Sequence, residues 1–144
     1  MEVIEAIRRI NYLMAETDTV YHKASQRIGV PDSVMRLLYT IRDNGDSCLL
    51  TRLYKQSGIS KQTANSAINK LEKEGYITVE PGGGRGRMVR FTERGLRYAA
   101  NTADKLIEIE CEVLKGFEPN EIEEHIRLLE KSMLGLKERA EDIK

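Results

Sequence analysis

Hydrophobic residues recur at helical spacing along most of the chain. Residues 2–25 are predicted to form a helix because apolar side chains return every three or four positions, at Val3, Ile7, Ile10 and Met14. Residues 29–32 break this helix, and Pro31 suits the first turn of a second one that runs to about Asn44. The first third of the chain therefore predicts two consecutive helices.

Two shorter helical segments follow a turn at residues 44–47. The first covers about residues 48–56, and residues 57–59 form a tight turn around Gly58. Ser60 is a suitable N-cap for the second segment, and Gly75 is placed to end it in the left-handed conformation. Apolar residues of the second segment have i, i+3, i+4, i+7 spacing, at Ala64, Ala67, Ile68 and Leu71. This pattern predicts one buried and one polar face.

One β-hairpin is expected in the whole chain. Residues 76–80 are predicted to be a strand and residues 87–91 the returning strand. The glycine-rich segment 81–86 connects them and forms a flexible tip. Two short helices, a turn and then a hairpin are the elements of a helix-turn-helix followed by a wing.

Two long helices are predicted to complete the chain. Thr92 caps a helix over about residues 93–115, residues 116–119 interrupt it, and a last helix runs from about Asn120 to the end. Apolar residues of the last helix alternate spacings of four and three, which predicts a seam against another helix. We expect this seam to be a dimer interface formed by Ile122, Ile126, Leu129, Met133 and Leu136.

The predicted fold is mainly α with one β-hairpin wing. Residues 1–44 would supply N-terminal helices for the core and for dimerisation, residues 45–97 the winged helix-turn-helix lobe, and residues 98–144 the dimerisation helices. Charge follows this division, because the lobe carries ten Lys/Arg against five Asp/Glu, whereas residues 98–144 carry seven against twelve. The basic lobe is therefore the candidate polyanion-binding surface.

Side chains on the polar face of residues 60–73 suit the grooves of DNA. They are short or flexible hydrogen-bonding groups that reach base edges and phosphates, and the start of this helix also offers free N–H groups to a phosphate. Taken alone, a solvated polar face would explain them equally well. The candidate DNA-binding residues here are Ser60, Lys61, Gln62, Thr63, Asn65, Ser66, Asn69, Lys70 and Lys73.

The predicted wing favours the DNA interpretation. Glycines let its tip approach DNA closely, and Arg85 can enter a narrow minor groove where the negative potential is concentrated. Arg87 and Arg90 can reach flanking phosphates. Base-edge contacts from Gln62, Asn65, Ser66 and Asn69 would then set sequence preference, and the cations would supply general attraction.

Residues 45–97 resemble the DNA-binding lobe of the MarR family of multiple-antibiotic-resistance regulators. The resemblance is carried by Leu53, residues 58–60, residues 71–77, Arg85 and residues 91–95. It implies a homodimer on a pseudo-palindromic operator, with repression as the expected mode and release by a small ligand or an oxidant. Family members usually have Asp where this chain has Gly83, and Thr-Arg where it has Asn65-Ser66. Tyr54 and Ser57 also stand where small and apolar residues are common.

A small aromatic effector would bind, by the same resemblance, in the crevice beside the lobe, and its candidate walls are Tyr12, Met14, Leu37, Tyr39 and Tyr98. Cys48 and Cys111 lie far apart and without metal spacing, so two half-buried hydrophobes are expected. Redox sensing is the alternative, because Cys48 lies near a predicted helix start that could stabilise a thiolate.

No catalytic or metal-binding pattern occurs in the sequence. The two histidines, His22 and His125, are far apart, and the glycine run lacks the Gly-Lys-Ser/Thr ending of a phosphate loop. We therefore expect no enzyme, no cofactor and no metal. The chain shows no signal peptide and no apolar run long enough for a membrane span, which predicts a cytoplasmic protein. The main alternative function is a winged-helix module that binds protein or RNA.

Overall fold

A computed structural model describes residues 1–84 and 86–144. Within these residues the chain forms seven helices and one three-stranded antiparallel sheet. It divides into two compact units, Met1–Leu106 and Ile107–Lys144, and each is described by itself. No helix in the described part is both long and apolar enough to cross a membrane.

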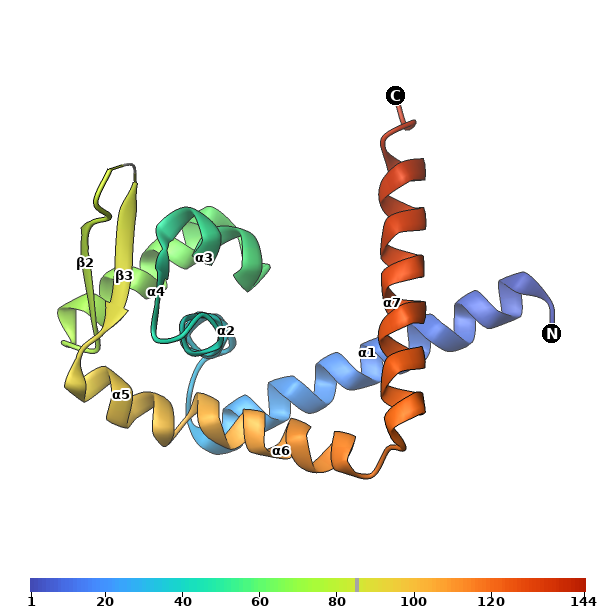
Figure 1. Cartoon of the computed structure of the whole chain (residues 1–144), viewed down its shortest axis with the longest axis horizontal. Helices are drawn as coiled ribbons and strands as arrows, with labels where there is room; N and C mark the ends of the chain where they lie inside the picture. The colour runs from blue at the N-terminus through green and yellow to red at the C-terminus, as the bar shows by residue number, and fades with distance from the viewer. Residues whose placement is uncertain (85) are drawn as a thin grey trace. The chain divides into compact units, whose positions relative to one another are not determined.

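The two predicted N-terminal helices are present. Helix α1 spans Val3–Ile28 and ends at Gly29, whose positive φ of 90° lets its N–H bond back to Ser25 and Gln26. Helix α2 spans Asp32–Asp43 directly after Pro31. Most of α1 is exposed, whereas α2 buries one whole face and forms the centre of the first unit (Figure 1).

The third predicted helix starts later than expected, because its first residues belong to a strand. Strand β1 covers Ser47–Leu49, and helix α3 covers Leu50–Ser57. Cys48 lies in β1 opposite Val89, so the expected isolated hairpin is a three-stranded sheet in the order β1-β3-β2. Asp46 makes this possible, since its carbonyl accepts from the Phe91 N–H and extends the ladder. Strand β1 was not predicted because a strand of three residues is too short to show a periodic pattern of apolar residues.

The helix-turn-helix and the hairpin are confirmed. Gly58 turns the chain from α3 into helix α4, Lys61–Lys73, and Gly75 follows with a φ of 83°. Strand β2, Ile77–Pro81, pairs antiparallel with strand β3, Arg87–Phe91, in the register that opposes Val79 to Val89. In Figure 1 the hairpin extends beside α4 and away from α2.

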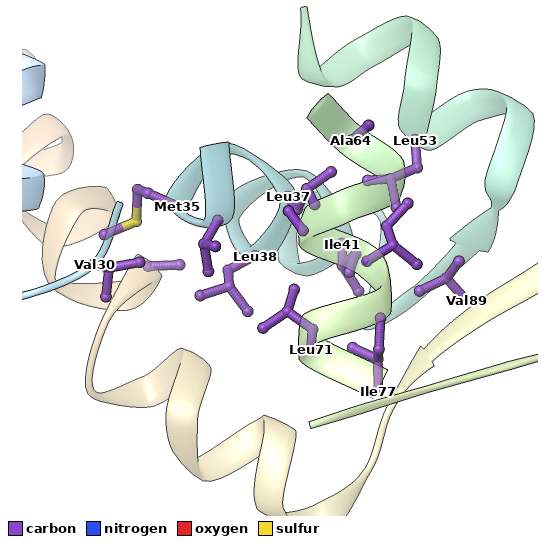
Figure 2. Close-up of a cluster of buried hydrophobic side chains, with 14 of the residues drawn as sticks. Val30, Met35, Leu37, Leu38, Ile41, Leu53, Ala64, Leu71, Ile77 and Val89 are labelled. Carbon is purple, nitrogen blue, oxygen red and sulfur yellow. The ribbon is translucent and has the colours of Figure 1, made fainter. Parts of the chain in front are cut away.

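The hydrophobic core of the first unit lies where α2, α3, α4 and the sheet meet (Figure 2). The predicted apolar stripe of α4 is buried there, which confirms the two-faced helix. Because long apolar side chains from five elements interlock, the core holds α4 rigidly and leaves its polar face outward. Its fully buried large side chains are Leu37, Leu38, Ile41, Leu53, Leu71, Ile77 and Val89.

The single helix expected over residues 93–115 is two helices. Helix α5 covers Glu93–Ala100 and helix α6 covers Ala103–Lys115. Between them the N–H of Thr102 bonds to Ala99 three residues back, and the Thr102 hydroxyl donates to the Tyr98 carbonyl at 2.7 Å. Side-chain hydrogen bonds to backbone carbonyls compete with the backbone hydrogen bonds of a helix, and here they accompany a local break. No glycine or proline lies at this break, so the sequence did not predict it.

The start of α5 sits unusually close to the start of β2. Thr92 caps the helix by accepting from the Gly95 N–H at 3.0 Å, and its hydroxyl donates to the Gly75 carbonyl at 2.6 Å. The Thr92 N–H bonds to the Tyr76 carbonyl. Gly95 then faces that carbonyl so closely that a Cβ there would lie 1.8 Å from its oxygen. A glycine is therefore required at this contact.

An ion-pair cluster joins α2 to the first turn of α6. Arg42 donates through Nε and Nη2 to the two Asp104 carboxylate oxygens at 2.9 and 2.8 Å, and through Nη1 to Asp46 at 2.9 Å. The hydrogen bonds from Arg42 lower the pKa of Asp104 despite its partial burial. The same bonds raise the pKa of Arg42 above its ordinary value. This cluster fixes α2 against α6 and the turn that leads into β1.

Asp104→Asn is expected to lower the free energy of unfolding by about 1–2 kcal/mol at neutral pH, because it removes a charge-assisted, two-pronged contact. Because the pKa of Asp104 is lower in the folded state, its carboxylate contributes fully to the free energy of unfolding at pH values above its unfolded pKa, near 3.8. That contribution is lost as the pH falls through the pKa of the folded state. The difference in free energy of unfolding between wild type and Asp104→Asn should therefore become smaller below about pH 4. Urea unfolding at pH 7 and pH 3 measures it.

Asp43→Asn is the matched control, since Asp43 is an exposed carboxylate on α2, next to Arg42 in the sequence. An Asp104→Asn cost that is equal at both pH values would contradict the pairing.

The second unit contains the rest of α6 and helix α7, Pro119–Ala140. A capping box starts α7, in which the Glu118 and Glu121 side chains each accept from the other's backbone N–H. Phe117 packs near His125 at this corner. The apolar residues of α7 are largely exposed in the single chain, so the unit presents an uncovered hydrophobic helix face.

Candidate nucleic-acid interface

Helix α4 presents one continuous polar face on the first unit. Every candidate residue predicted on it is exposed, namely Lys61, Gln62, Thr63, Asn65, Ser66, Asn69, Lys70 and Lys73. The core on its opposite side keeps these side chains from turning inward. The structure thus brings all the predicted helix residues together on one surface.

The first turn of α4 is capped as the sequence predicts. The Ser60 Oγ accepts from the Thr63 N–H at 3.2 Å and donates to the Thr63 hydroxyl at 2.9 Å. Ser66 also has a local partner, because its hydroxyl donates to the Gln62 carbonyl at 3.2 Å. The Ser66 oxygen therefore keeps only acceptor capacity toward a ligand.

The sequence did not predict that Tyr54 contacts Asn65. Its hydroxyl, on α3, donates to the Asn65 Oδ1 on α4. The Lys61 ammonium lies 5.5 Å from the centre of the Tyr54 ring, within cation–π range. The two partners are eleven residues apart and lie on different helices, so periodicity could not pair them; the only signal was a large phenol at a position where small residues are common.

The described part of the wing carries two exposed cations with different surroundings. Arg87 is exposed at the start of β3, where its guanidinium donates to the Val79 carbonyl at a long distance of 3.5 Å. Arg90 forms an ion pair with Glu80 across the hairpin at 2.8 Å. Glu80 would compete with a phosphate for Arg90, which the sequence prediction did not include. Arg85 lies outside the described residues.

Cys48 does not have the surroundings of a redox sensor. It lies near the start of α3, as expected, but it belongs to strand β1 and is only 5% exposed. Burial raises the pKa of its thiol, and nearby Arg52 offsets that effect only in part. Since the thiolate is the reactive form, this thiol is a small hydrophobe of the core. Cys111 is exposed in the second unit.

In a Cys111→Ser variant, Cys48 is expected to react with a disulfide reagent at least about tenfold more slowly in the folded protein than in denaturant. Burial and the raised pKa both cause the delay. Stopped-flow absorbance with a chromogenic disulfide measures the two rates. Equal rates would contradict the buried position, and the wild type provides the control in which both thiols are present.

The five candidate effector residues have unlike surroundings in the first unit. Tyr12 and Met14 are exposed on α1, Tyr39 is half-buried, and Leu37 is fully buried in the core. Tyr98 is half-buried and stacks on Tyr76 with ring centres 4.1 Å apart. Burial raises the pKa of the Tyr98 hydroxyl, with smaller effects from Tyr76 and Glu74.

Among residues 1–84 and 86–144, no group of three His, Cys, Asp or Glu side chains is close enough to hold a metal ion.

Two comparisons with known protein sequences were informative for the middle of the chain only. The model of the MarR family matches residues 28–88, which cover α2, the helix-turn-helix and most of the wing. No curated protein sequence matches the chain.

Solved structures share the fold along nearly the whole chain. A MarR family regulator from Neisseria meningitidis is 21% identical with a TM-score of 0.82, and the match covers 100% of both chains. A MarR family transcriptional regulator from Streptomyces coelicolor, solved in complex with DNA, is 20% identical with a TM-score of 0.69, covering 94% of this chain and 93% of that one.

A third solved structure concerns regulation by a small molecule. It is that of the Bordetella bronchiseptica protein BpsR, whose DNA binding is regulated by 6-hydroxynicotinic acid. BpsR is 19% identical with a TM-score of 0.65, and the match covers 87% of this chain and 98% of that one. Residues 28–88 therefore match the model of the MarR family, and the chain shares its winged helix-turn-helix fold with solved MarR family regulators.

Proposed function

We propose that the chain acts as a homodimer that binds a pseudo-palindromic operator and represses transcription there. The observation that carries this proposal is the rigidly held α4 with its uninterrupted polar face, next to a basic wing. A helix of this kind fits the major groove, and the adjacent hairpin reaches the flanking backbone and minor groove. A dimer covering such a site excludes other proteins from it, which is the basis for repression.

The site residues divide by chemistry into readers and anchors. Gln62, Asn65 and Asn69 carry amides that can match donor and acceptor patterns of base edges. Lys61, Lys70, Lys73 and Arg87 carry charges that attract phosphates of any sequence. Arg90 is the weakest anchor in this proposal because Glu80 already neutralises it. Arg85 belongs to the anchors on sequence grounds alone.

Dimerisation is supported by the hydrophobic faces that a single chain leaves uncovered. Large apolar side chains of α7 are about half exposed or more, among them Ile126, Leu129, Met133 and Leu136. Helix α1 exposes a second series, including Val3, Ile7 and Ile10. Single folded chains rarely leave apolar surface of this extent in water. A second copy of the same chain is the partner that the 4-3 seam predicts.

Fluorescence anisotropy on a preferred duplex and a random duplex, at several salt concentrations, tests the proposal. Wild type should bind both and weaken steeply with salt, because cation release drives the interaction. Arg87→Ala should weaken binding to both and reduce the salt slope by about one. Lys23→Ala, an exposed cation on α1, is the matched control and should change neither.

Asn65→Ala should lose roughly tenfold in affinity on the preferred duplex and much less on the random one. Equal losses on both would contradict its role as a reader. If wild type binds no duplex even at low salt, the proposed function is wrong and the interaction-module alternative replaces it.

Regulation by a small aromatic effector is a second proposal, supported by BpsR and by the stacked Tyr76–Tyr98 pair. Tyr98 lies on α5, and Tyr76 lies in the link between α4 and β2, so a ligand that separated the rings would act on α5 and on the link that follows α4. A ligand changes DNA affinity only if it binds two arrangements unequally. Adding 6-hydroxynicotinic acid or a phenolic compound should shift the melting temperature and weaken operator binding. No change in either quantity would count against it.

A further inference from the structure

Asn65 has a hydrogen-bond partner that limits how it can meet a base. Its Oδ1 accepts from the Tyr54 hydroxyl, which reaches it from the neighbouring helix. An asparagine amide has one oxygen, which can accept two hydrogen bonds, and one NH₂ group, which can donate two. With the oxygen turned toward Tyr54, the NH₂ group points away from α3 and stays available on the exposed face of α4.

Tyr54 is itself held in place, so the contact is not an incidental surface encounter. Its ring is half-buried and packs against the hydrophobic core. The Lys61 ammonium lies above the ring, and the buried Ser57 donates its hydroxyl to the Tyr54 carbonyl at 3.4 Å. A ring that packs on the core and carries the Lys61 ammonium on its face can hold the amide that its hydroxyl contacts.

We propose that Tyr54 is a positioning residue that turns the Asn65 oxygen toward α3 and presents the Asn65 NH₂ group to the base, and that Asn65 therefore selects guanine in each half-site. This inference rests on the proposed function and names its base preference. Free asparagine prefers adenine, because its oxygen accepts from N6 while its nitrogen donates to N7. With the oxygen turned toward Tyr54 and away from the base, the bond from N6 is lost, and the NH₂ group faces the donor N6 instead.

Guanine is the base whose edge fits a lone donor best. Its major-groove edge presents two adjacent acceptors, N7 and O6, and no donor. The same NH₂ group can therefore approach both acceptors without opposing another N–H. Cytosine presents a donor in that groove and is rejected by the same argument.

Competitive anisotropy with purified full-length protein tests the inference. The preferred duplex is compared with duplexes that carry a symmetric replacement at each half-site position. At the position where Asn65→Ala abolishes discrimination, wild type should favour guanine over adenine by roughly tenfold. Tyr54→Phe frees the Asn65 oxygen and should reduce this preference to within about twofold or reverse it toward adenine. Tyr21→Phe, which removes a phenol hydroxyl from α1, is the matched control and should keep the wild-type preference.

A second variant keeps the test independent of how well Tyr54→Phe folds. Asn65→Asp has no donor, so it should lose the guanine preference and favour the donor edge of cytosine. An adenine preference of wild type at this position, or a guanine preference that survives in Tyr54→Phe, would overturn the inference while salt-dependent duplex binding stays intact. Absence of all duplex binding by wild type would instead contradict the proposed function.

Discussion

Gly95→Ala is expected to lower the free energy of unfolding by about 2–4 kcal/mol, although it adds one methyl group to a helix. The added Cβ would lie 1.8 Å from the Tyr76 carbonyl oxygen and 3.1 Å from the Phe91 ring. That oxygen belongs to the backbone and also accepts from the Thr92 N–H. Neither partner can move away without breaking the cap of α5, so the helix must shift off the sheet. Urea unfolding followed by circular dichroism measures the loss.

Gly135→Ala is the matched control for this substitution. Gly135 lies inside α7, and a Cβ there would meet only the flexible Arg139 side chain at 3.7 Å. By helical geometry it also faces away from the apolar seam. Replacing it should stabilise the protein by about 0.5–1 kcal/mol, as alanine does in helix interiors. A Gly95→Ala variant as stable as wild type would show that α5 does not pack this closely on β2.

Leu129→Asp is expected to separate the proposed dimer. Leu129 is 58% exposed in the single chain and stands in the middle of the 4-3 seam. If the seam is buried between two copies, each copy would place a carboxylate in an apolar interface without a partner. The dissociation constant of the dimer should rise by at least about 100-fold. Sedimentation at micromolar concentration should show a dimer for wild type and a monomer for the variant.

Lys131→Asp places the same carboxylate two residues away, on the opposite face of α7, and should remain a dimer. The monomeric Leu129→Asp should also lose its affinity for a two-half-site duplex, because one lobe alone makes half of the contacts. A wild type that sediments as a monomer would contradict the dimer, as would a dimeric Leu129→Asp.

Much of the fold was predictable because the local sequence patterns favour the same helices and strands that the packing of the core requires. The apolar stripe of α4, the N-cap at Ser60 and the strand over residues 87–91 are all where the sequence placed them. In each case a short-range rule, such as helical spacing or cap chemistry, coincides with what the three-dimensional packing requires. The polar face of α4 followed from the same spacing.

Features that depend on distant partners were not predictable. Strand β1 exists because β3 offers it a ladder, and the break after α5 depends on where the Thr102 and Asn101 side chains find carbonyls. The buried place of Cys48 follows from β1. The Tyr54–Asn65 and Glu80–Arg90 pairs join residues ten or eleven positions apart on different elements, and only the folded chain brings them together.

The measurement that tests the central claim most directly is selection of bound duplexes from a random double-stranded DNA library by the purified protein. Operator binding by a symmetric dimer predicts an enriched pseudo-palindrome whose half-sites are centred about 10 base pairs apart, one turn of the double helix. Asn65→Ala should reduce the base preference at one symmetric pair of positions in that consensus and leave the half-site spacing unchanged. A library that emerges without enrichment, or an enriched site without symmetry, would contradict the account.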